Sequence, residues 1–468
     1  MIISPQIPVI LIRDTISDTV LRLRTQADQN ITGCIDWLSP PLYLRKKGSK
    51  IHASHTLSEL YDKATFTPND LSKSAIRDFI ANGPSIYNQS IYCDVVTAPP
   101  GSKLKISPDG TIRIERQLIS EEQLVQQFEP TNIEALLCDE IQKSLKKLKS
   151  KRICFALSGG VDSTLLVALC KHHKIDNDIT CYTADTGIGN DLTHARAAAQ
   201  ALDTGLTTVK IDYSSNALTE QARLSKASGC PIPFIGNSIG FSLICKAARD
   251  DGFDAIIDGT GSDQIFAGTY GIHGLHWYTS AISMLPAIHS AEFREHTTTH
   301  SLLSKKAKNR LNRKPPESFS LYLYDEITQG SLQNWRVQHR ASSLANDIQV
   351  ITPFLRQNIA RNIWSPLDNF YQKGINKFML RNILAKYVPN EIAWRVDNQG
   401  LRWSTSKLYS NNRNEIAGTI RNNYKSLSTM LNTLQRLAYS SGVASKSKIM
   451  RIYSICSLLS NPAEVSRT

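Results

Sequence analysis

Paired cysteines are absent from this sequence. Its nine cysteines are scattered, odd in number and form no CxxC pair, which argues against a zinc site and a disulfide framework and favours a reducing cytoplasm. Long uncharged apolar runs are also absent, so we expect no transmembrane segment. The first residues, MIISPQIPVILIRDTISDTV, have neither a basic start nor a small-residue cleavage site, so we expect no signal peptide. The sequence therefore predicts a cytoplasmic protein.

Acidic residues are in deficit. The 468-residue chain has 54 Lys and Arg against 41 Asp and Glu, a net charge of +13, which favours anionic partners without identifying them. Its length suggests two or three domains, and its 41% hydrophobic and 20% charged residues are ordinary for a globular protein. We interpret one basic run, KKAKNRLNRKPP at 305–316, as a solvated helix end and loop rather than a binding patch.

Residues 1–125 are predicted to form a small, mainly β domain. Alternating apolar residues around a Lys-Gly turn predict a hairpin within 40–54, and a Pro-Asp-Gly turn predicts a second hairpin within 101–116. Between them, 71–83 has the apolar spacing of a helix that ends at a glycine.

Residues 126–468 are predicted to form a second domain with a different pattern of apolar residues. An amphipathic helix over 131–150 is followed by strand-like runs that alternate with helix-like runs. The strand-like runs are RICFALS, DITCYTA, TTVKID and DAIIDGTGSD, and the helix-like runs are DSTLLVALCKHH, NDLTHARAAAQAL and NSIGFSLICKAARDDG. This alternation predicts an α/β fold, a parallel sheet with helices on both faces, and the chain after about 275 is expected to be mostly helical.

The junction between the first strand and its helix, FALSGGVDSTLLVAL, has the composition of an anion site. Gly159 and Gly160 can take positive φ, and their amides and the helix N-terminus favour a phosphate. The GxxxxGK[ST] lysine and the GxGxxG pattern are both absent. Asp162 in the first helical turn suits a Mg²⁺ ligand beside phosphates, whereas the plainer alternative is a βα turn with a capping serine.

The motif SGGVDS resembles the pyrophosphate loop of the ATP pyrophosphatase (PP-loop) superfamily, whose members cleave ATP between the α and β phosphates. The stretch DAIIDGTGSDQIFAG at 254–268 resembles the second signature of the asparagine synthetase family within it. The resemblance implies ATP and Mg²⁺ as cofactors, with Asp162 and Asp263 as metal-binding and catalytic carboxylates. The implied ATP and pyrophosphate site comprises Leu157, Ser158, Gly159, Gly160, Val161, Asp162, Ser163, Gly259, Thr260, Gly261 and Ser262. For Asp263 the plainer alternative is a turn aspartate that caps a helix.

The resemblance covers most of the chain and implies an adenine nucleotide α-hydrolase-like fold behind a glutaminase-like front domain. Similar segments are found at 72–107, 182–202, 351–365 and 376–395. Glutamine-dependent members need an N-terminal cysteine, but this chain begins Met1-Ile2 and its first cysteine is Cys34. We therefore expect a degenerate front domain and an attacking nitrogen that belongs to the substrate.

Two further departures concern the synthetase part. Thr260 and Gln264 stand where asparagine-making members have glutamate, which suggests a different nucleophile and leaves the general base unassigned. The loop WRVDNQGLRWSTSK has Asp397 near the position of a family lysine. Arg395, Arg402 or Lys407 are candidates to replace it, and we name Arg395 and Lys407 as catalytic candidates.

Family members without the nucleophilic cysteine include β-lactam-type synthetases and lasso-peptide cyclases, and this sequence most resembles a lasso-peptide cyclase, a macrolactam synthetase. The expected partners are then a precursor peptide with an acidic acceptor side chain, a leader peptidase and a leader-recognition protein, and no nucleic acid. The alternatives are an amide synthetase for a small substrate, a tRNA-modifying enzyme of the same superfamily, and a nucleotide-binding scaffold without activity.

Overall fold

The computed structural model describes much of the chain, with gaps between the described segments. The described residues are 9–12, 22–25, 31–48, 50–61, 68–82, 90–116, 132–148, 152–175, 178–232, 235–268, 323–324, 327–328, 331–365, 369–372, 375–395, 401, 403–431, 436 and 445–459. Within these segments, every helix is too short or too polar to span a bilayer. All nine cysteines carry free thiols. The predicted basic loop at 305–316, Asp397 and Arg402 lie outside the described residues.

A five-stranded parallel sheet forms the centre of the larger half of the molecule, in the order β11-β10-β9-β12-β13. Its strands are β9 (Ile153–Ala156), β10 (Thr180–Asp185), β11 (Gly205–Lys210), β12 (Ala255–Ile257) and β13 (Gln349–Ile351). The predicted parallel sheet is therefore confirmed. The prediction missed β13, because we expected the chain after about 275 to be helical.

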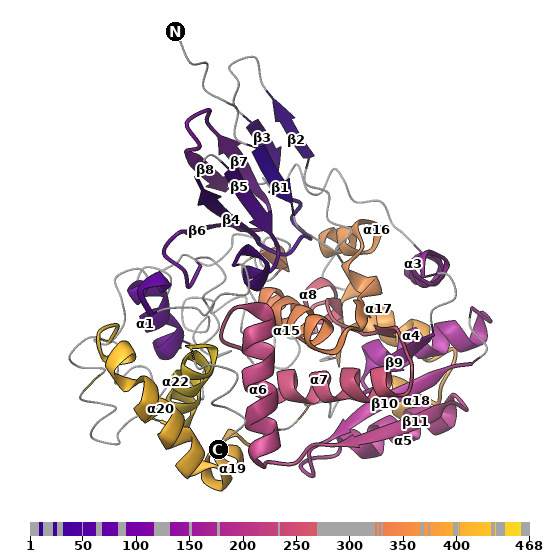
Figure 1. The fold of residues 1–468 in the computed structure, drawn as a ribbon. Coiled ribbons are helices and arrows are strands. Elements are labelled where there is room, and N and C mark those ends of the chain that lie inside the picture. Colours follow the sequence, from indigo (N-terminus) through magenta and orange to yellow (C-terminus); the bar gives the residue numbers. More distant parts are fainter. Residues whose placement is uncertain are drawn as a thin grey trace.

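Helices cover both faces of this sheet, as predicted (Figure 1). Phe155 and Cys181 point into a core shared with α3, α4, α5 and α17, whereas Cys154 and Tyr182 point into a core shared with α6, α7 and α22. The helices are α3 (Ile133–Lys147), α4 (Val161–His172), α5 (Asp191–Ala201), α6 (Ser215–Ser228), α7 (Ile235–Asp250), α17 (Phe378–Leu384) and α22 (Lys446–Leu459). The sequence reading did not include α6.

The N-terminal part of the chain forms two small sheets, in the orders β1-β5-β4-β6 and β2-β3-β7-β8. Their strands are β1 (Val9–Ile12), β2 (Arg22–Thr25), β3 (Ile31–Cys34), β4 (Leu42–Lys47), β5 (Lys50–Ser54), β6 (Val95–Ala98), β7 (Ser102–Ile106) and β8 (Ile112–Arg116). Both predicted hairpins, β4–β5 and β7–β8, are present. Buried Leu44 and Ile51 of one sheet share a core with Leu104 and Ile106 of the other.

The front segment also packs against the remainder of the chain. Helix α1 (Lys73–Asn82), which was predicted within 71–83, lies beside α22 (Figure 1), and Arg77 Nε donates to Met430 O at 2.8 Å. On α15 (Ser331–Asn346), the Arg336 guanidinium donates to the carbonyls of Leu38 and Ser39. The domain boundary at residue 125 stays a prediction, and residues on its two sides share extensive contacts.

The remaining described elements are short segments and one long C-terminal helix. They are η1 (Leu57–Leu60), η2 (Pro68–Asp70), α8 (Ser262–Ile265), η5 (Pro353–Leu355), α16 (Gln357–Ala360), η6 (Arg361–Trp364), β14 (Tyr371–Gln372), β15 (Ile375–Asn376), α18 (Asn390–Ala393), α19 (Thr405–Asn411) and α20 (Arg413–Ser428).

The order of the parallel strands marks one place on the sheet. From β9 the chain builds outward through β10 and β11, and then returns to add β12 and β13 on the other side of β9. The connections therefore leave β9 and β12 in opposite directions, which creates a crevice at their carboxyl ends. This crevice is where ligands bind in open α/β sheets.

Candidate functional site

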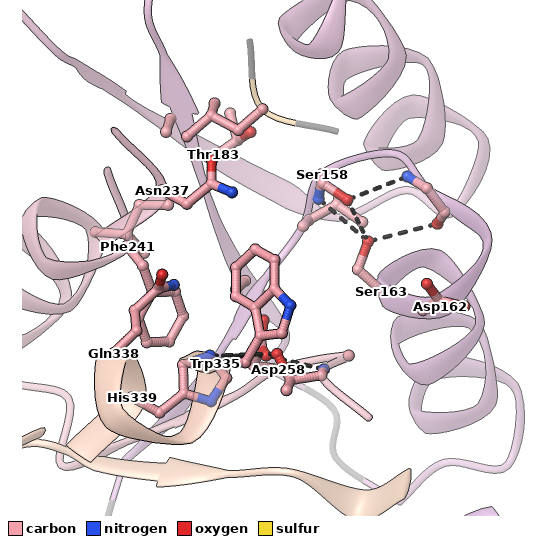
Figure 2. Close-up of a pocket in the computed structure, with 18 of the residues that line it drawn as sticks. Ser158, Asp162, Ser163, Thr183, Asn237, Phe241, Asp258, Trp335, Gln338 and His339 are labelled. Atoms are coloured by element: carbon pink, nitrogen blue, oxygen red, sulfur yellow. Dashed lines mark hydrogen bonds and ion pairs between the residues drawn. The ribbon is translucent and has the colours of Figure 1, made fainter. Parts of the chain in front are cut away.

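A cavity of about 400 Å³ lies at the crevice between the carboxyl ends of β9 and β12 (Figure 2). The β9–α4 loop lines one side of it, and residues of α7 and α15 line the other. Among the residues that line it are Leu157, Ser158, Gly160, Asp162, Ser163, Asn237, Phe241, Asp258, Gly259, Thr260, Gly261, Asp263, Gln264, Trp335, Gln338 and His339. The cavity therefore contains most of the site predicted from the sequence.

Gly159 is required in the β9–α4 loop because of its conformation and its neighbours. Its φ is +72°, and a Cβ atom there would lie 2.3 Å from the backbone carbon of His194 on α5. Gly160, in contrast, has φ −74° and is the N-cap of α4. The sequence prediction of positive φ thus holds for one of the two glycines, and α5 explains why that one has no side chain.

Two serines fold the loop back on itself. Ser158 N–H donates to Ser163 Oγ at 3.1 Å, the two hydroxyls lie 3.1 Å apart, and Gly160 N–H donates to Ser158 Oγ at 3.3 Å. These bonds place the amides at the start of the 12-residue helix α4 beside the cavity. An anion at this position would meet backbone N–H groups and the positive end of the helix dipole.

The β12–α8 loop lies directly against the β9–α4 loop. A Cβ on Gly259 would come within 3.0 Å of Asp162 Cβ, so a side chain there would force the loops apart. Gly261 has φ +97°, a conformation that L side chains rarely adopt. Ser262 is fully buried and its hydroxyl donates to Asp162. The two loops therefore lie side by side at one sheet edge, as predicted.

Lys377 lies between the two aspartates, and the sequence reading did not identify it as a site residue. Its Nζ pairs with Asp162 Oδ2 and lies 2.5 Å from Asp263 Oδ1, while its side chain is only 5% exposed. Burial alone would lower the pKa of Lys377, but the two carboxylates outweigh it and raise that pKa above 10.5. Lys377 also has φ +52°, an uncommon conformation for a non-glycine residue.

The donors at this point fit a magnesium ion bound with phosphates. Asp162 and Asp263 offer hard oxygen ligands on two sides of a position that a cation, the Lys377 ammonium, already occupies. Mg²⁺ is commonly bound by one or two carboxylates together with waters and substrate phosphates. Among the described residues, no cluster of three or more His, Cys, Asp or Glu side chains could hold a metal by itself. The site therefore suits a metal that arrives with a nucleotide.

The two catalytic candidates from the 395–407 region have different positions. Arg395 donates to Gly159 O at 2.9 Å and so contacts the β9–α4 loop. Lys407 is not among the residues that line the cavity, because its Nζ lies over the Tyr213 ring, 4.7 Å from the ring centre. Of the remaining predicted residues, Val161 is buried in the sheet core at the start of α4.

The far side of the cavity carries a polar cluster around His339 of α15. The Thr260 hydroxyl lies 3.2 Å from His339 Nε2, and Asp258 Oδ2 lies 3.3 Å from the same atom. Asp258 also accepts from Thr260 N–H at 2.9 Å. The Phe241 ring packs on the imidazole with ring centres 4.6 Å apart. Three contacts, from Thr260, Asp258 and Phe241, thus fix His339 at the cavity wall.

Sequence reasoning missed Lys377, Asp258 and the residues of α15. Asp258 had a usable signal, because it follows the strand AII at the same sheet edge as the predicted loop. Lys377 precedes an apolar helix in a segment that was interpreted only as helical. His339 had no local signal, because nothing in its own helix distinguishes it from a core histidine.

Comparison with known proteins identifies the family of this chain. The asparagine synthase family model matches residues 133–439. A probable asparagine synthetase (glutamine-hydrolyzing) of Acanthamoeba polyphaga mimivirus is 25% identical over 272 residues, 57% of this chain and 42% of the relative. A GMP synthase (glutamine-hydrolyzing) of Flavobacterium psychrophilum is 29% identical over 119 residues, 25% of this chain and 23% of the relative. The chain thus aligns with less than half the length of either relative. Because the family model covers more than half of the chain, this protein belongs to the asparagine synthase family.

Proposed function

We propose that this protein is an ATP-dependent ligase that adenylates a peptide carboxylate, releases pyrophosphate and closes a macrolactam with an amine of the same peptide, as lasso-peptide cyclases do. The observation that carries the ATP-dependent half is the meeting of two loops at the sheet crevice. There Asp162 and Asp263 flank the buried cation Lys377, beside the amides that begin α4. Family membership supports amide formation with ATP.

The residues of the β9–α4 and β12–α8 loops, together with Lys377 and Arg395, each have a part in this proposal. The amides at the start of α4 bind phosphate oxygens, and Ser158 and Ser163 hold the loop in shape. Asp162 and Asp263 would hold Mg²⁺, which neutralises phosphate charge and favours departure of pyrophosphate. Lys377 supplies a fixed positive charge in a water-poor setting, where charge stabilisation is strongest. Arg395 donates to the loop carbonyl of Gly159 and so helps to hold the β9–α4 loop in place.

The macrolactam half rests on what surrounds the rest of the cavity. Thr260 and Gln264 stand where asparagine-making members have glutamate, so the pocket lacks two anionic side chains. Trp335 and Gln338 line it instead, offering an aromatic face and an amide to a peptide backbone. The net charge of +13 suits a peptide with an acidic acceptor side chain. Holding amine and acyl group in one molecule lowers the barrier by several kcal/mol.

A panel of synthetic peptides tests the proposal. Each peptide has a free α-amine and one internal Asp or Glu, and each is incubated with the protein, ATP and Mg²⁺. We expect AMP in solution and a peptide product lighter by one water. An N-acetylated copy of the active peptide is the matched control, because it keeps the carboxylate and loses the nucleophile. It should yield no dehydrated product.

Three results would count against the proposal. ADP as the nucleotide product contradicts adenylation. Turnover with free amino acids alone would mean that the substrate is a small molecule and not a peptide. No AMP with any peptide, even with a candidate leader-recognition protein and leader peptidase added, contradicts the whole proposal, including those two partners.

A further inference from the structure

The cluster of His339, Asp258 and Thr260 has no part in the phosphate chemistry described above. His339 lies on α15, and its Nε2 faces Thr260 Oγ1 at 3.2 Å and Asp258 Oδ2 at 3.3 Å. All three residues line the same cavity as Asp162 and Asp263, and Figure 2 shows His339 and Asp258 at this cavity. The cluster therefore lies at the cavity, where α15 meets the β12–α8 loop.

The three residues are arranged so that one of them can move a proton. Asp258 Oδ2 is fixed because it accepts Thr260 N–H at 2.9 Å. When Nε2 carries the proton, it donates to this carboxylate, and the lone pair of the neutral ring is then on Nδ1. Phe241 packs on the ring and restricts its rotation. In that tautomer, a neutral imidazole with a carboxylate behind it has the arrangement of a general base.

The geometry points to His339 as the general base of amide formation, the residue that takes the proton from the attacking amine, with Asp258 and Thr260 positioning it. This inference rests on the proposed function. In the step, the amine nitrogen forms a bond to the acyl carbon of the adenylate, and the bond from that carbon to the AMP oxygen breaks. AMP leaves with the bonding electrons, and one amine proton passes to His339 and then to solvent.

The charges around the ring are suited to this step. The charged groups that face the imidazole are Asp258 at the end of β12 and Arg336 one turn earlier on α15, and α7 presents the uncharged Phe241. Burial lowers the pKa of His339 below 6.5, Asp258 opposes this shift and Arg336 adds to it. The ring is therefore neutral at neutral pH, and Asp258 stabilises the imidazolium once the proton arrives.

The test separates two half-reactions on one peptide, an acidic peptide from the panel that gives AMP with the natural protein. Exchange of labelled pyrophosphate into ATP reports adenylation, which needs no base for an amine. Loss of one water from the peptide reports amide formation. We expect His339→Gln to retain exchange and to slow amide formation about 100-fold. Asp258→Asn should slow only the amide step, and by less.

A pH series and a chemical rescue distinguish a base from a structural residue. The ratio of the natural rate to the His339→Gln rate should fall as pH is raised from about 7 to about 9, because hydroxide replaces the missing base. In His339→Ala, added imidazole should restore part of the amide step. Ser343→Ala is the matched control on α15, since its buried hydroxyl has no hydrogen-bond partner and its loss should change neither half-reaction.

The outcomes separate this inference from the proposed function. If the natural protein exchanges no pyrophosphate with any acidic peptide, the proposed function fails first. If His339→Gln forms the amide at the natural rate, the inference is wrong and the proposed function stands. If His339→Gln loses exchange as severely as amide formation, or if the rate ratio is constant with pH, His339 is a structural residue and the inference is also wrong.

Discussion

The two ends of the cavity are built in different ways. The phosphate end consists of two short loops, each contiguous in the sequence, whose glycines let backbones approach closely and whose aspartates come at fixed offsets. The α15 end combines side chains of α15 and α7 with Asp258 and Thr260 of the β12–α8 loop, and these meet only in the folded chain. If the proposed function holds, the phosphate end activates the carboxylate and the α15 end meets the acceptor.

This difference predicts a division of labour. Substitutions at the phosphate end should abolish both half-reactions, because no acyl-adenylate forms. Substitutions at the α15 end should leave nucleotide chemistry intact and alter the acceptor step. The experiments below test that division, in order of decreasing effect.

Loss of either carboxylate should be the most severe change. Asp162→Asn and Asp263→Asn are each expected to reduce AMP formation about 1000-fold, because metal and Lys377 both lose a partner. AMP release measured by chromatography checks this. Asp347→Asn is the control, since its surface pair with Arg249 is 91% exposed at the carboxylate and should matter little. Retained activity in Asp162→Asn would refute the assignment of metal ligands.

Replacement of Lys377 by methionine should lower AMP formation about 100-fold. It should also raise the affinity for Mn²⁺ in the absence of ATP, because two carboxylates would then lack their resident cation. Calorimetric titration with Mn²⁺ gives a readout that does not depend on turnover. The control is Lys386→Met, whose ammonium is 59% exposed and pairs with Glu134. Equal Mn²⁺ affinity in Lys377→Met and the natural protein would contradict the placement of Lys377.

Gly159→Ala should destabilise the fold by about 2 kcal/mol, because its Cβ meets the α5 backbone. Gly187→Ala is a matched control with a similar φ of +67° and open space around its Cβ, and it should cost about 1 kcal/mol. Denaturant unfolding of the two variants separates collision from backbone strain. Equal losses of stability would mean that α5 does not constrain the loop.

The smallest effect is expected for Gln338→Ala at the α15 end. Loss of one hydrogen-bonding amide should cost about 1 kcal/mol, which raises the KM for the peptide about fivefold. The KM for ATP should not change, because Gln338 lies on the far wall from the β9–α4 loop (Figure 2). Steady-state kinetics with each substrate varied in turn checks the split. An equal rise in the KM for ATP would contradict the separation of nucleotide binding from acceptor binding at the two ends.

Features that depend on local motifs could be predicted from the sequence, whereas features that depend on tertiary contacts could not. The sheet, the Gly159 turn and the Asp162–Asp263 pairing could be predicted, because each depends on a local motif or on the rule that parallel strands share an edge. Lys377 could not, since it lies 215 residues from Asp162 in sequence and its position depends on the packing of α17 against α4. Likewise, Thr260 and His339 are 79 residues apart. The placement of Lys407 away from the cavity depends on Tyr213, another tertiary contact.

Helix α15 connects the reaction chamber to the front of the molecule. It carries Gln338 and His339 at the cavity, and one turn away it carries Arg336, which donates to the carbonyls of Leu38 and Ser39. Because linkage is reciprocal, an occupant that orders α15 from the cavity must tighten the docking of the front sheets by the same free energy. Through Arg336, the N-terminal sheets would then influence the affinity of the cavity for its occupant.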